Sequence, residues 1–160
     1  MSGRRVALAD LAATERLGQA IAKALRAGDV VALSGGLGAG KTTLARAIIR
    51  ALGHAGEVPS PSFAIIETYD PPLVRLPLVH ADFYRLNDPA EAEELGLDDY
   101  RHGAAMIAEW PDHAGGFGRE PSCLAIHFET PQESCEPEAA NDRVVLVEPG
   151  ADWLGREPWI

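Results

Sequence analysis

The sequence contains little cysteine and no long apolar run. Cys123 and Cys135 are its two cysteines among 160 residues, and no histidines surround them at zinc-binding spacing. One such pair does not make a disulfide scaffold or a zinc module, so we expect both thiols to be reduced and structural. No apolar run approaches the roughly 20 residues of a membrane helix. The arginine-bearing start is interrupted by Asp10 and Glu15 before any signal-peptide core forms. These absences predict a cytoplasmic protein without a membrane segment.

Positive charge is also scarce. The chain has 14 Lys and Arg residues against 24 Asp and Glu residues, a formal net charge of −10. Proteins that hold nucleic acid by themselves usually present a basic face, because neutralisation of phosphates dominates their affinity. The composition therefore argues against direct binding of DNA or tRNA. An apolar content of 46% is that of an ordinary globular protein, and the length suits one domain.

A phosphate-binding motif is the most informative feature present. Residues 33–43 read LSGGLGAGKTT, and Gly35 to Thr42 match G-x-x-x-x-G-K-[ST], the P-loop. Its glycines let the backbone approach phosphates, Lys41 is expected at the β- and γ-phosphates, and the Thr42 hydroxyl at Mg²⁺. The same letters begin with LSGG, which also occurs in the signature of transporter ATPases. That signature lies far downstream of the P-loop, so the match is accidental. A dinucleotide fingerprint is excluded because Lys41 stands where its third glycine belongs.

The pattern around this motif predicts alternating strands and helices. A helix is expected from a Thr14 cap to about Arg26, with Gly28 just beyond its end, and another over 41–52. Asp88 and Glu91 predict a further helix start, with an end near 95–96. Strands are expected at 6–9, 30–33, 63–69, 76–81 and 104–108, and as an antiparallel pair at 124–128 and 144–147. We therefore predict an α/β fold with one P-loop ATP-binding domain over residues 1–148. The acidic stretch 129–142 is expected to be a solvated loop, and residues 149–160 a tail without predicted structure.

Two acidic residues end predicted strands downstream of the P-loop. Asp82 follows LPLVHA and Glu109 follows AAMIA. A P-loop enzyme needs acidic side chains to organise Mg²⁺ and the attacking water. We therefore predict Lys41, Asp82 and Glu109 as catalytic residues, and Thr42, Asp82 and Glu109 as metal ligands. The sequence leaves open which acid holds the metal.

These motifs together resemble one protein family. In chain order they are GGLGAGKTTLAR at 35–46, LG at 52–53, SPSF at 60–63, HADFYRL at 80–86, LG at 95–96 and EWP at 109–111. The combination is similar to the bacterial TsaE family over about residues 5–148. That family is the ATPase component of the machinery that forms threonylcarbamoyladenosine at position 37 of tRNAs.

The resemblance implies a fold, cofactors and partners. The fold is a three-layer P-loop NTPase domain with a mixed sheet, and the cofactors are ATP and Mg²⁺. Hydrolysis is expected to be slow and to depend on the TsaD and TsaB proteins, which leaves tRNA as an indirect partner. The modified tRNAs are those that read codons beginning with A. The residues expected to contact the nucleotide are Thr14, Gly38, Ala39, Gly40, Lys41, Thr42 and Thr43.

Five further residues have open or minor roles. Thr14 is either a plain helix cap or a nucleotide contact. Ser62 stands where the family usually has threonine and keeps a hydroxyl for a switch-like role. Trp110 either flanks the nucleotide or packs as an ordinary aromatic. His80 is expected to be structural, and the resemblance gives no role to Arg143.

Three alternatives differ in class. A small-molecule P-loop kinase needs an arginine-bearing lid, and the segments Asp70–Arg75 and Arg101–Gly103 are too short for one. A GTPase needs an N-K-x-D-like guanine-reading tetrapeptide, which the sequence lacks. An ATP-dependent interaction module without useful turnover stays open, because the sequence does not separate it from a slow ATPase.

We predict that the protein prefers ATP to GTP, since no guanine-reading tetrapeptide is present. Titration with both nucleotides in the presence of Mg²⁺ measures the two dissociation constants. Equal affinities would contradict the prediction.

Overall fold

The computed structural model describes residues 3–36, 38–61, 65–129 and 143–156, whose strands form a single mixed sheet. The strand order is β1-β7-β6-β2-β5-β4-β3. The strands are β1 (Arg4–Leu8), β2 (Val30–Gly35), β3 (Ile66–Tyr69), β4 (Leu78–Asp82), β5 (Ala105–Glu109), β6 (Cys123–Phe128) and β7 (Arg143–Pro149). The helices are α1 (Leu11–Ala24), α2 (Lys41–Ala51), α3 (Ala90–Glu94) and α4 (Leu97–Arg101), with 3₁₀ turns η1 (Pro111–Ala114) and η3 (Ala151–Trp153).

The centre of the sheet is parallel and its two margins are antiparallel. β2 pairs in parallel with β5 and with β6, and β4 pairs in parallel with β5. The remaining pairs, β3 with β4, β6 with β7 and β1 with β7, are antiparallel. The mixed sheet and the antiparallel pairing of the last two strands confirm the sequence predictions. The parallel centre brings the carboxyl ends of four strands to one edge, where open α/β sheets bind ligands.

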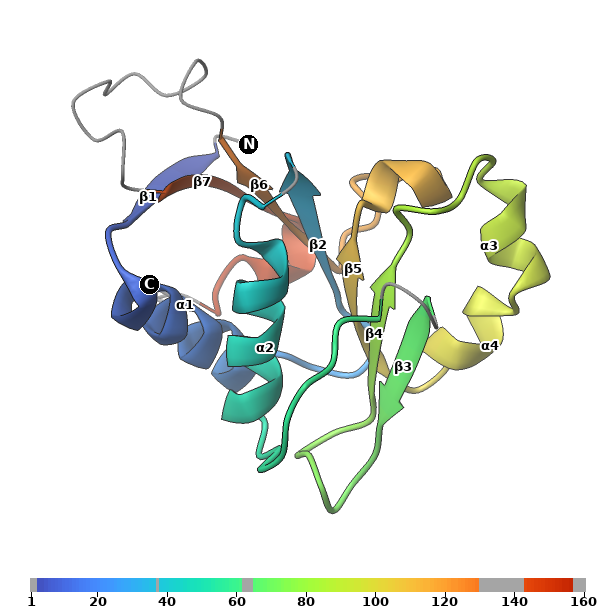
Figure 1. Ribbon diagram of the computed structural model, residues 1–160, viewed down its shortest axis with the longest axis horizontal. Coiled ribbons are helices and arrows are strands. Elements are labelled where there is room, and N and C mark those ends of the chain that lie inside the picture. Colours follow the sequence, from blue (N-terminus) through green and yellow to red (C-terminus); the bar gives the residue numbers. More distant parts are fainter. Residues whose placement is uncertain (1–2, 37, 62–64, 130–142, 157–160) are drawn as a thin grey trace.

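Helices cover both faces of the sheet, so the predicted three layers are confirmed (Figure 1). On one face, α1 and α2 pack through residues such as Leu17 and Ile48 against Val31 and Ile107. On the other face, α3, α4 and the segment after η1 pack against alternate residues of the same strands, among them Val30, Ala32 and Met106. The apolar run in β2 is thus explained, since that strand is buried on both faces. No helix in the described part of the chain is long and apolar enough to cross a membrane.

The contact between α1 and α2 is close because one residue has no side chain. A Cβ built on Gly18 of α1 would lie 2.6 Å from the Ala47 Cβ of α2, much nearer than carbon atoms pack. Glycine and alanine at this crossing let the two helices approach. The contact fixes α1 against the helix that carries the P-loop lysine, so the start of α1 lies near the P-loop.

Two local predictions are wrong, and one short helix was not predicted. Thr14 does not cap α1, because the Asp10 carboxylate accepts a hydrogen bond from the Ala13 amide and starts the helix earlier. Gly28 is not the helix cap either, since α1 ends at Ala24 and Leu25 is already extended. The short helix α4 was not predicted from the sequence. The predicted helix start at 88–91 is confirmed, because the carboxylates of Asp88 and Glu91 accept amide hydrogen bonds there.

Several expectations concern residues that lie outside the described ones. They are the switch-like Ser62 with Phe63, the thiol of Cys135, the acidic stretch 130–142 and Trp159. Cys123 is described, and it is a free and buried cysteine. Burial, followed by the nearby charge of Glu120, raises the pKa of its thiol to about 11. This fits the structural role expected for that thiol.

The segment after β7 packs onto the body of the protein. Trp153 is fully buried, and its indole Nε1–H donates to the Ser122 carbonyl. Arg156 forms two hydrogen bonds with the buried Asp29 carboxylate, at 2.5 and 3.2 Å, and a third with the Ala24 carbonyl. Its guanidinium also lies 4.6 Å from the centre of the Trp153 ring. These contacts tie residues 150–156 to the turn between α1 and β2.

We expect Asp29→Ala and Arg156→Ala each to lower the free energy of unfolding by about 3–5 kcal/mol, because each leaves a buried charge without its partner. Arg101→Ala is the control, because its ion pair with Glu120 is partly exposed and is expected to be worth at most about 1 kcal/mol. Urea denaturation measures all three. Losses as small as that of the control would contradict the proposed anchoring.

Candidate nucleotide-binding site

The P-loop joins the carboxyl end of β2 to the amino end of α2. Gly38 and Gly40 adopt φ angles of 70° and 111°, which side-chain-bearing residues rarely adopt. Gly40 is the residue before the first turn of α2, and no side chain caps that helix end. The first amide groups of α2 are therefore left without side-chain acceptors at the positive end of the helix dipole. Such an end suits an anion such as a phosphate.

Lys41 contacts its own loop. Its ammonium Nζ donates to the carbonyls of Gly35, at 3.0 Å, and Gly36, at 2.6 Å. Nζ also lies 4.4 Å from the centre of the Trp110 ring. Burial lowers the pKa of Lys41, while the negative charges of Glu109 and Asp82 oppose this change. The carboxylates thus favour the charged ammonium that a phosphate site requires.

The two predicted acids lie side by side at the edge of the sheet. Asp82 ends β4 and Glu109 ends β5, and the parallel register pairs these two residues directly. The Thr42 hydroxyl donates to Glu109 Oε1 at 2.7 Å, and His80 Nε2 lies 2.7 Å from Glu109 Oε2. Asp82 Oδ1 accepts a hydrogen bond from the Tyr84 amide. Residues distant in sequence thus meet around one buried carboxylate.

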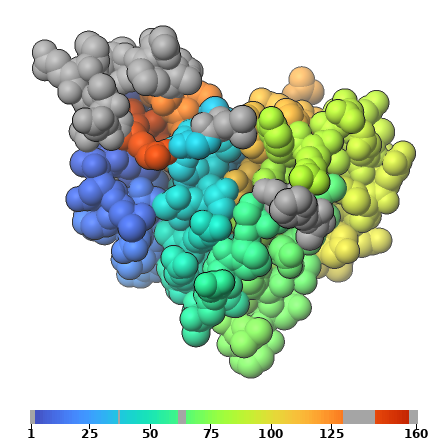
Figure 2. Space-filling view, in the orientation of Figure 1, coloured from blue at the N-terminus to red at the C-terminus, as the bar shows by residue number. Residues whose placement is uncertain are grey.

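These groups line one hollow, and a second hollow adjoins it. The first has a volume of about 270 Å³ and is lined by Gly38, Ala39, Gly40, Lys41, Thr42, Thr43, Asp82, Tyr84, Glu109, Trp110 and Arg143. The second, of about 320 Å³, is lined by Leu8, Ala9, Asp10, Leu11, Thr14, Gly40, Thr43 and Arg143. The start of α2, in cyan, lies near the surface between the N-terminal segment and the segment after β4 (Figure 2). Every residue predicted for the nucleotide site borders one of the two hollows.

The donor atoms in the first hollow fit Mg²⁺. They include the Thr42 hydroxyl and the carboxylates of Asp82 and Glu109, all of them the hard oxygen ligands that this ion takes. Among the described residues no group of three or more His, Cys, Asp or Glu side chains is placed to hold a metal.

Comparison with known sequences identifies the family. The sequence model of the family described as threonylcarbamoyl adenosine biosynthesis protein TsaE matches residues 8–139. The chain belongs to the TsaE family. The matched range includes the P-loop, both acids and α1 but ends before Arg143, so it contains all of the site described above except that residue.

Individual relatives agree with this assignment. Three proteins named tRNA threonylcarbamoyladenosine biosynthesis protein TsaE match over 95, 98 and 110 residues. The Streptomyces coelicolor protein is 47% identical over 59% of this chain and 64% of its own length. The Bacillus subtilis protein is 43% identical over 61% of this chain and 60% of its own length. The Synechocystis protein is 41% identical over 66% of this chain and 68% of its own length. The matches thus span about two thirds of the relatives' lengths or less.

A solved structure supports the fold of this TsaE-family chain. The crystal structure of YdiB from Bacillus subtilis superposes with a TM-score of 0.72 at 27% sequence identity. The superposition covers 96% of this chain and 90% of that one. The P-loop α/β fold predicted from the sequence is therefore confirmed.

Arg143 is a site residue whose position the sequence did not reveal. Its Nη1 donates to the Gly38 carbonyl at 2.9 Å, and its side chain borders both hollows. Arg143 opens β7, which pairs with β1 and β6 rather than with β2. Its approach to the P-loop depends on strand order, which local sequence does not contain. No local signal pointed to this position, and the resemblance described above gives Arg143 no role.

Aromatic rings form a second feature that local sequence did not predict. The ring centres of Tyr84 and Trp110 lie 4.9 Å apart, and His113 lies 5.5 Å from Trp110 and 6.0 Å from Tyr84. Trp110 has a positive φ of 56°, which is unusual for a bulky residue. Trp110 therefore packs in this cluster with its ring against the Lys41 ammonium, and its contact with the nucleotide stays a prediction.

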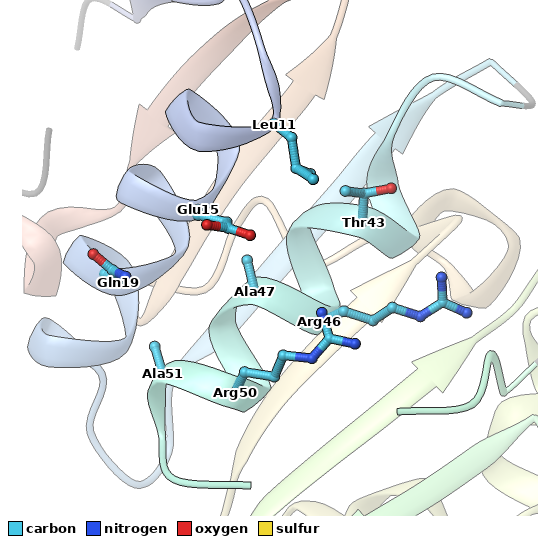
Figure 3. Close-up of a pocket in the computed structure, with 8 residues that line it drawn as sticks. All are labelled: Leu11, Glu15, Gln19, Thr43, Arg46, Ala47, Arg50 and Ala51. Atoms are coloured by element: carbon cyan, nitrogen blue, oxygen red, sulfur yellow. The ribbon is translucent and has the colours of Figure 1, made fainter. Parts of the chain in front are cut away.

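A larger groove lies between α1 and α2, away from the acids. It has a volume of about 490 Å³ and is lined by Leu11, Glu15, Gln19, Thr43, Arg46, Ala47, Arg50 and Ala51. Both arginine side chains extend from α2 away from α1 (Figure 3). Arg46 is in addition bound to the Val58 carbonyl. The groove is lined by one carboxylate, Glu15, and by no P-loop glycine, so size alone does not identify the site.

We predict that Gly40→Ala weakens nucleotide binding by about tenfold or more and lowers stability by about 1–3 kcal/mol. A Cβ at Gly40 would lie 2.9 Å from Arg143 Nη1 and 3.2 Å from the Phe128 ring, at a φ that alanine rarely adopts. Gly36→Ala is the matched control, because its Cβ would meet nothing within 4 Å and its φ is not positive. Nucleotide titration and urea denaturation measure both effects. Equal behaviour of the two variants would contradict the role of the Gly40 conformation.

Proposed function

We propose that this chain is an ATPase that acts in the formation of threonylcarbamoyladenosine at position 37 of tRNAs. The observation that carries the proposal is the meeting of the P-loop, Lys41 and the carboxylates of Asp82 and Glu109 at one hollow. Membership of the TsaE family supplies the pathway, because the relatives are named for this tRNA modification. The site of action is the cytoplasm, where tRNA is modified.

The P-loop residues bind and orient the nucleotide. Amide groups of Gly38 to Thr43 meet the phosphates, with the helix dipole of α2 behind them. Lys41 exchanges the carbonyls of Gly35 and Gly36 for the β- and γ-phosphates. Arg143 donates to the Gly38 carbonyl of the loop and contributes a second positive charge. Thr14 borders the adjoining hollow and faces the rest of the nucleotide.

Asp82 and Glu109 are the residues proposed to bind the metal and to orient the attacking water. Thr42 and one carboxylate would hold Mg²⁺, which would supply positive charge for the phosphate oxygens. With its hydroxyl engaged in that site, Thr42 would no longer donate to Glu109 Oε1, which accepts its hydrogen bond in this structure. That oxygen is then able to accept a hydrogen bond from water and orient it toward the phosphate. Asp82, paired with Glu109 across the strands, completes the acidic edge.

The proposal assigns the chemistry on tRNA to partner proteins. A net charge of −10 opposes binding to a polyanion by this chain alone. The hollows that border the P-loop are used for nucleotide, which leaves no separate site there for threonylcarbamoyl transfer. ATP binding or hydrolysis therefore drives a conformational step in the TsaD–TsaB pair, which carries out the transfer.

We expect tRNA modification over many turnovers to require this chain with an intact P-loop. The assay combines TsaD, TsaB, tRNA, a threonylcarbamoyl donor and ATP with Mg²⁺, and compares wild-type protein, Lys41→Ala and no added chain. Lys41→Ala should reduce ATP turnover by about 100-fold or more, since it removes the charge at the phosphates. Asp82→Ala and Glu109→Ala should each reduce turnover more than they reduce stability.

Three results would contradict the proposal. Modification that continues through many turnovers without the chain would remove its role in the pathway. Undiminished ATP turnover in folded Lys41→Ala would refute the site. Tight, salt-sensitive binding of tRNA by the isolated chain would show that it recognises tRNA directly. Modification that needs bound ATP but no hydrolysis would instead favour the interaction module.

A further inference from the structure

A buried histidine contacts the carboxylate at the centre of the site. His80 has no solvent exposure, and Glu109 is 2% exposed. His80 lies on β4 two residues before Asp82, so both side chains point to the same face of the sheet. That face also carries Glu109, because Asp82 and Glu109 are paired in register. The distance from His80 Nε2 to Glu109 Oε2 is 2.7 Å.

The hydrogen-bond chemistry of this contact fixes which imidazole nitrogen bears hydrogen. An ionised carboxylate only accepts hydrogen bonds, so His80 Nε2 must donate to Glu109 Oε2. His80 Nδ1 is buried and has no hydrogen-bond partner among the described residues. A lone pair on Nδ1 costs less to bury unpaired than an N–H group. The contacts therefore correspond to the tautomer with hydrogen on Nε2.

Glu109 depends on two donors, and only one of them stays in place during the proposed reaction. Thr42 donates to Oε1 and His80 to Oε2. Under the proposed function the Thr42 hydroxyl leaves Glu109 for the metal. His80 then remains as the side chain that keeps the carboxylate in one orientation, against rotation about the three side-chain torsions of glutamate.

We propose that His80 is a positioning residue, whose Nε2–H holds the Glu109 carboxylate so that Oε1 faces the metal and the attacking water. This inference rests on the proposed ATPase function and extends it beyond the P-loop and the acidic pair. The arrangement corresponds to the carboxylate–histidine contacts that orient metal-site groups in other proteins, where loss of the outer residue typically costs about 10- to 100-fold in metal affinity or activity.

Three substitutions separate positioning from packing. In His80→Gln the side-chain amide nitrogen reaches about the position of Nε2, so a donor to Glu109 remains. In His80→Asn the amide reaches only about the position of Nδ1, and in His80→Leu the donor is absent. Val79→Ala is the control, because Val79 is buried on the same strand and packs on the opposite face. The control measures how far loss of packing on β4 alone affects turnover.

We expect kcat to fall in the leucine and asparagine variants of His80 and to be largely kept in the glutamine variant. In the complex with TsaD and TsaB, His80→Leu and His80→Asn should lower the kcat of ATP hydrolysis by about 10- to 100-fold. They should also raise the Mg²⁺ concentration needed for half-maximal nucleotide binding. His80→Gln should keep most of the wild-type kcat and most of the wild-type Mg²⁺ dependence. Val79→Ala should change neither quantity beyond its effect on the folded fraction. A glutamine variant as impaired as the leucine variant, with both folded, would overturn the proposal.

Nitrogen-15 NMR of the histidine ring, on the full chain without nucleotide, tests the same contact without activity. We expect His80 to carry hydrogen on Nε2, with a resonance that moves in Glu109→Gln. Hydrogen on Nδ1, or a resonance that does not shift in Glu109→Gln, would contradict the positioning role even if ATP turnover is normal. Absence of ATP turnover in the wild-type complex would instead refute the proposed function, and the inference with it, so the two failures are distinguishable.

Discussion

The burial of the Glu109 carboxylate is the constraint around which this protein is arranged. An ionised carboxylate removed from water costs several kcal/mol unless donors compensate it. The compensating donors are Thr42 on α2 and His80 on β4, while Glu109 itself ends β5. One side chain thus joins the P-loop helix to two strands of the sheet. The 2.7 Å contacts on both oxygens require the parallel register that places Asp82 beside Glu109.

That register also explains why the site lies at one edge of the sheet. β2, β5 and β4 run in parallel, so the P-loop, Glu109 and Asp82 all follow carboxyl ends of adjacent strands. After each of these strands the chain must turn at the same edge of the sheet. Glycine provides this turn at Gly38 and Gly40, and the unusual φ of Trp110 directs the chain after Glu109 toward the Lys41 ammonium.

Sequence patterns were sufficient to predict those features of the structure whose physical cause lies in neighbouring residues of the chain. Eight consecutive residues were enough to predict the P-loop. The pattern of apolar residues was enough to predict the buried strand β2 and the helix α2. The cap at Asp10 was missed because Asp10 and Thr14 are both acceptable caps, and only the Ala13 amide contact distinguishes them. Arg143, His80 and Tyr84 could not be located, because their roles depend on strand order and on contacts between residues far apart in sequence. The anchoring of Arg156 on Asp29 was hidden for the same reason.

The contacts at the site also bear on why turnover is expected to be slow in the isolated chain. Lys41 is held by two carbonyls and by the Trp110 ring, and the Thr42 hydroxyl by Glu109. A nucleotide with its metal must replace each of these bonds with another of similar strength, so much of its binding energy is offset. A ligand shifts a conformational equilibrium only by the difference between its affinities for the two states. A partner that favoured the arrangement with these bonds exchanged would raise turnover, so the partner dependence proposed above would act on the same few hydrogen bonds that keep Glu109 buried.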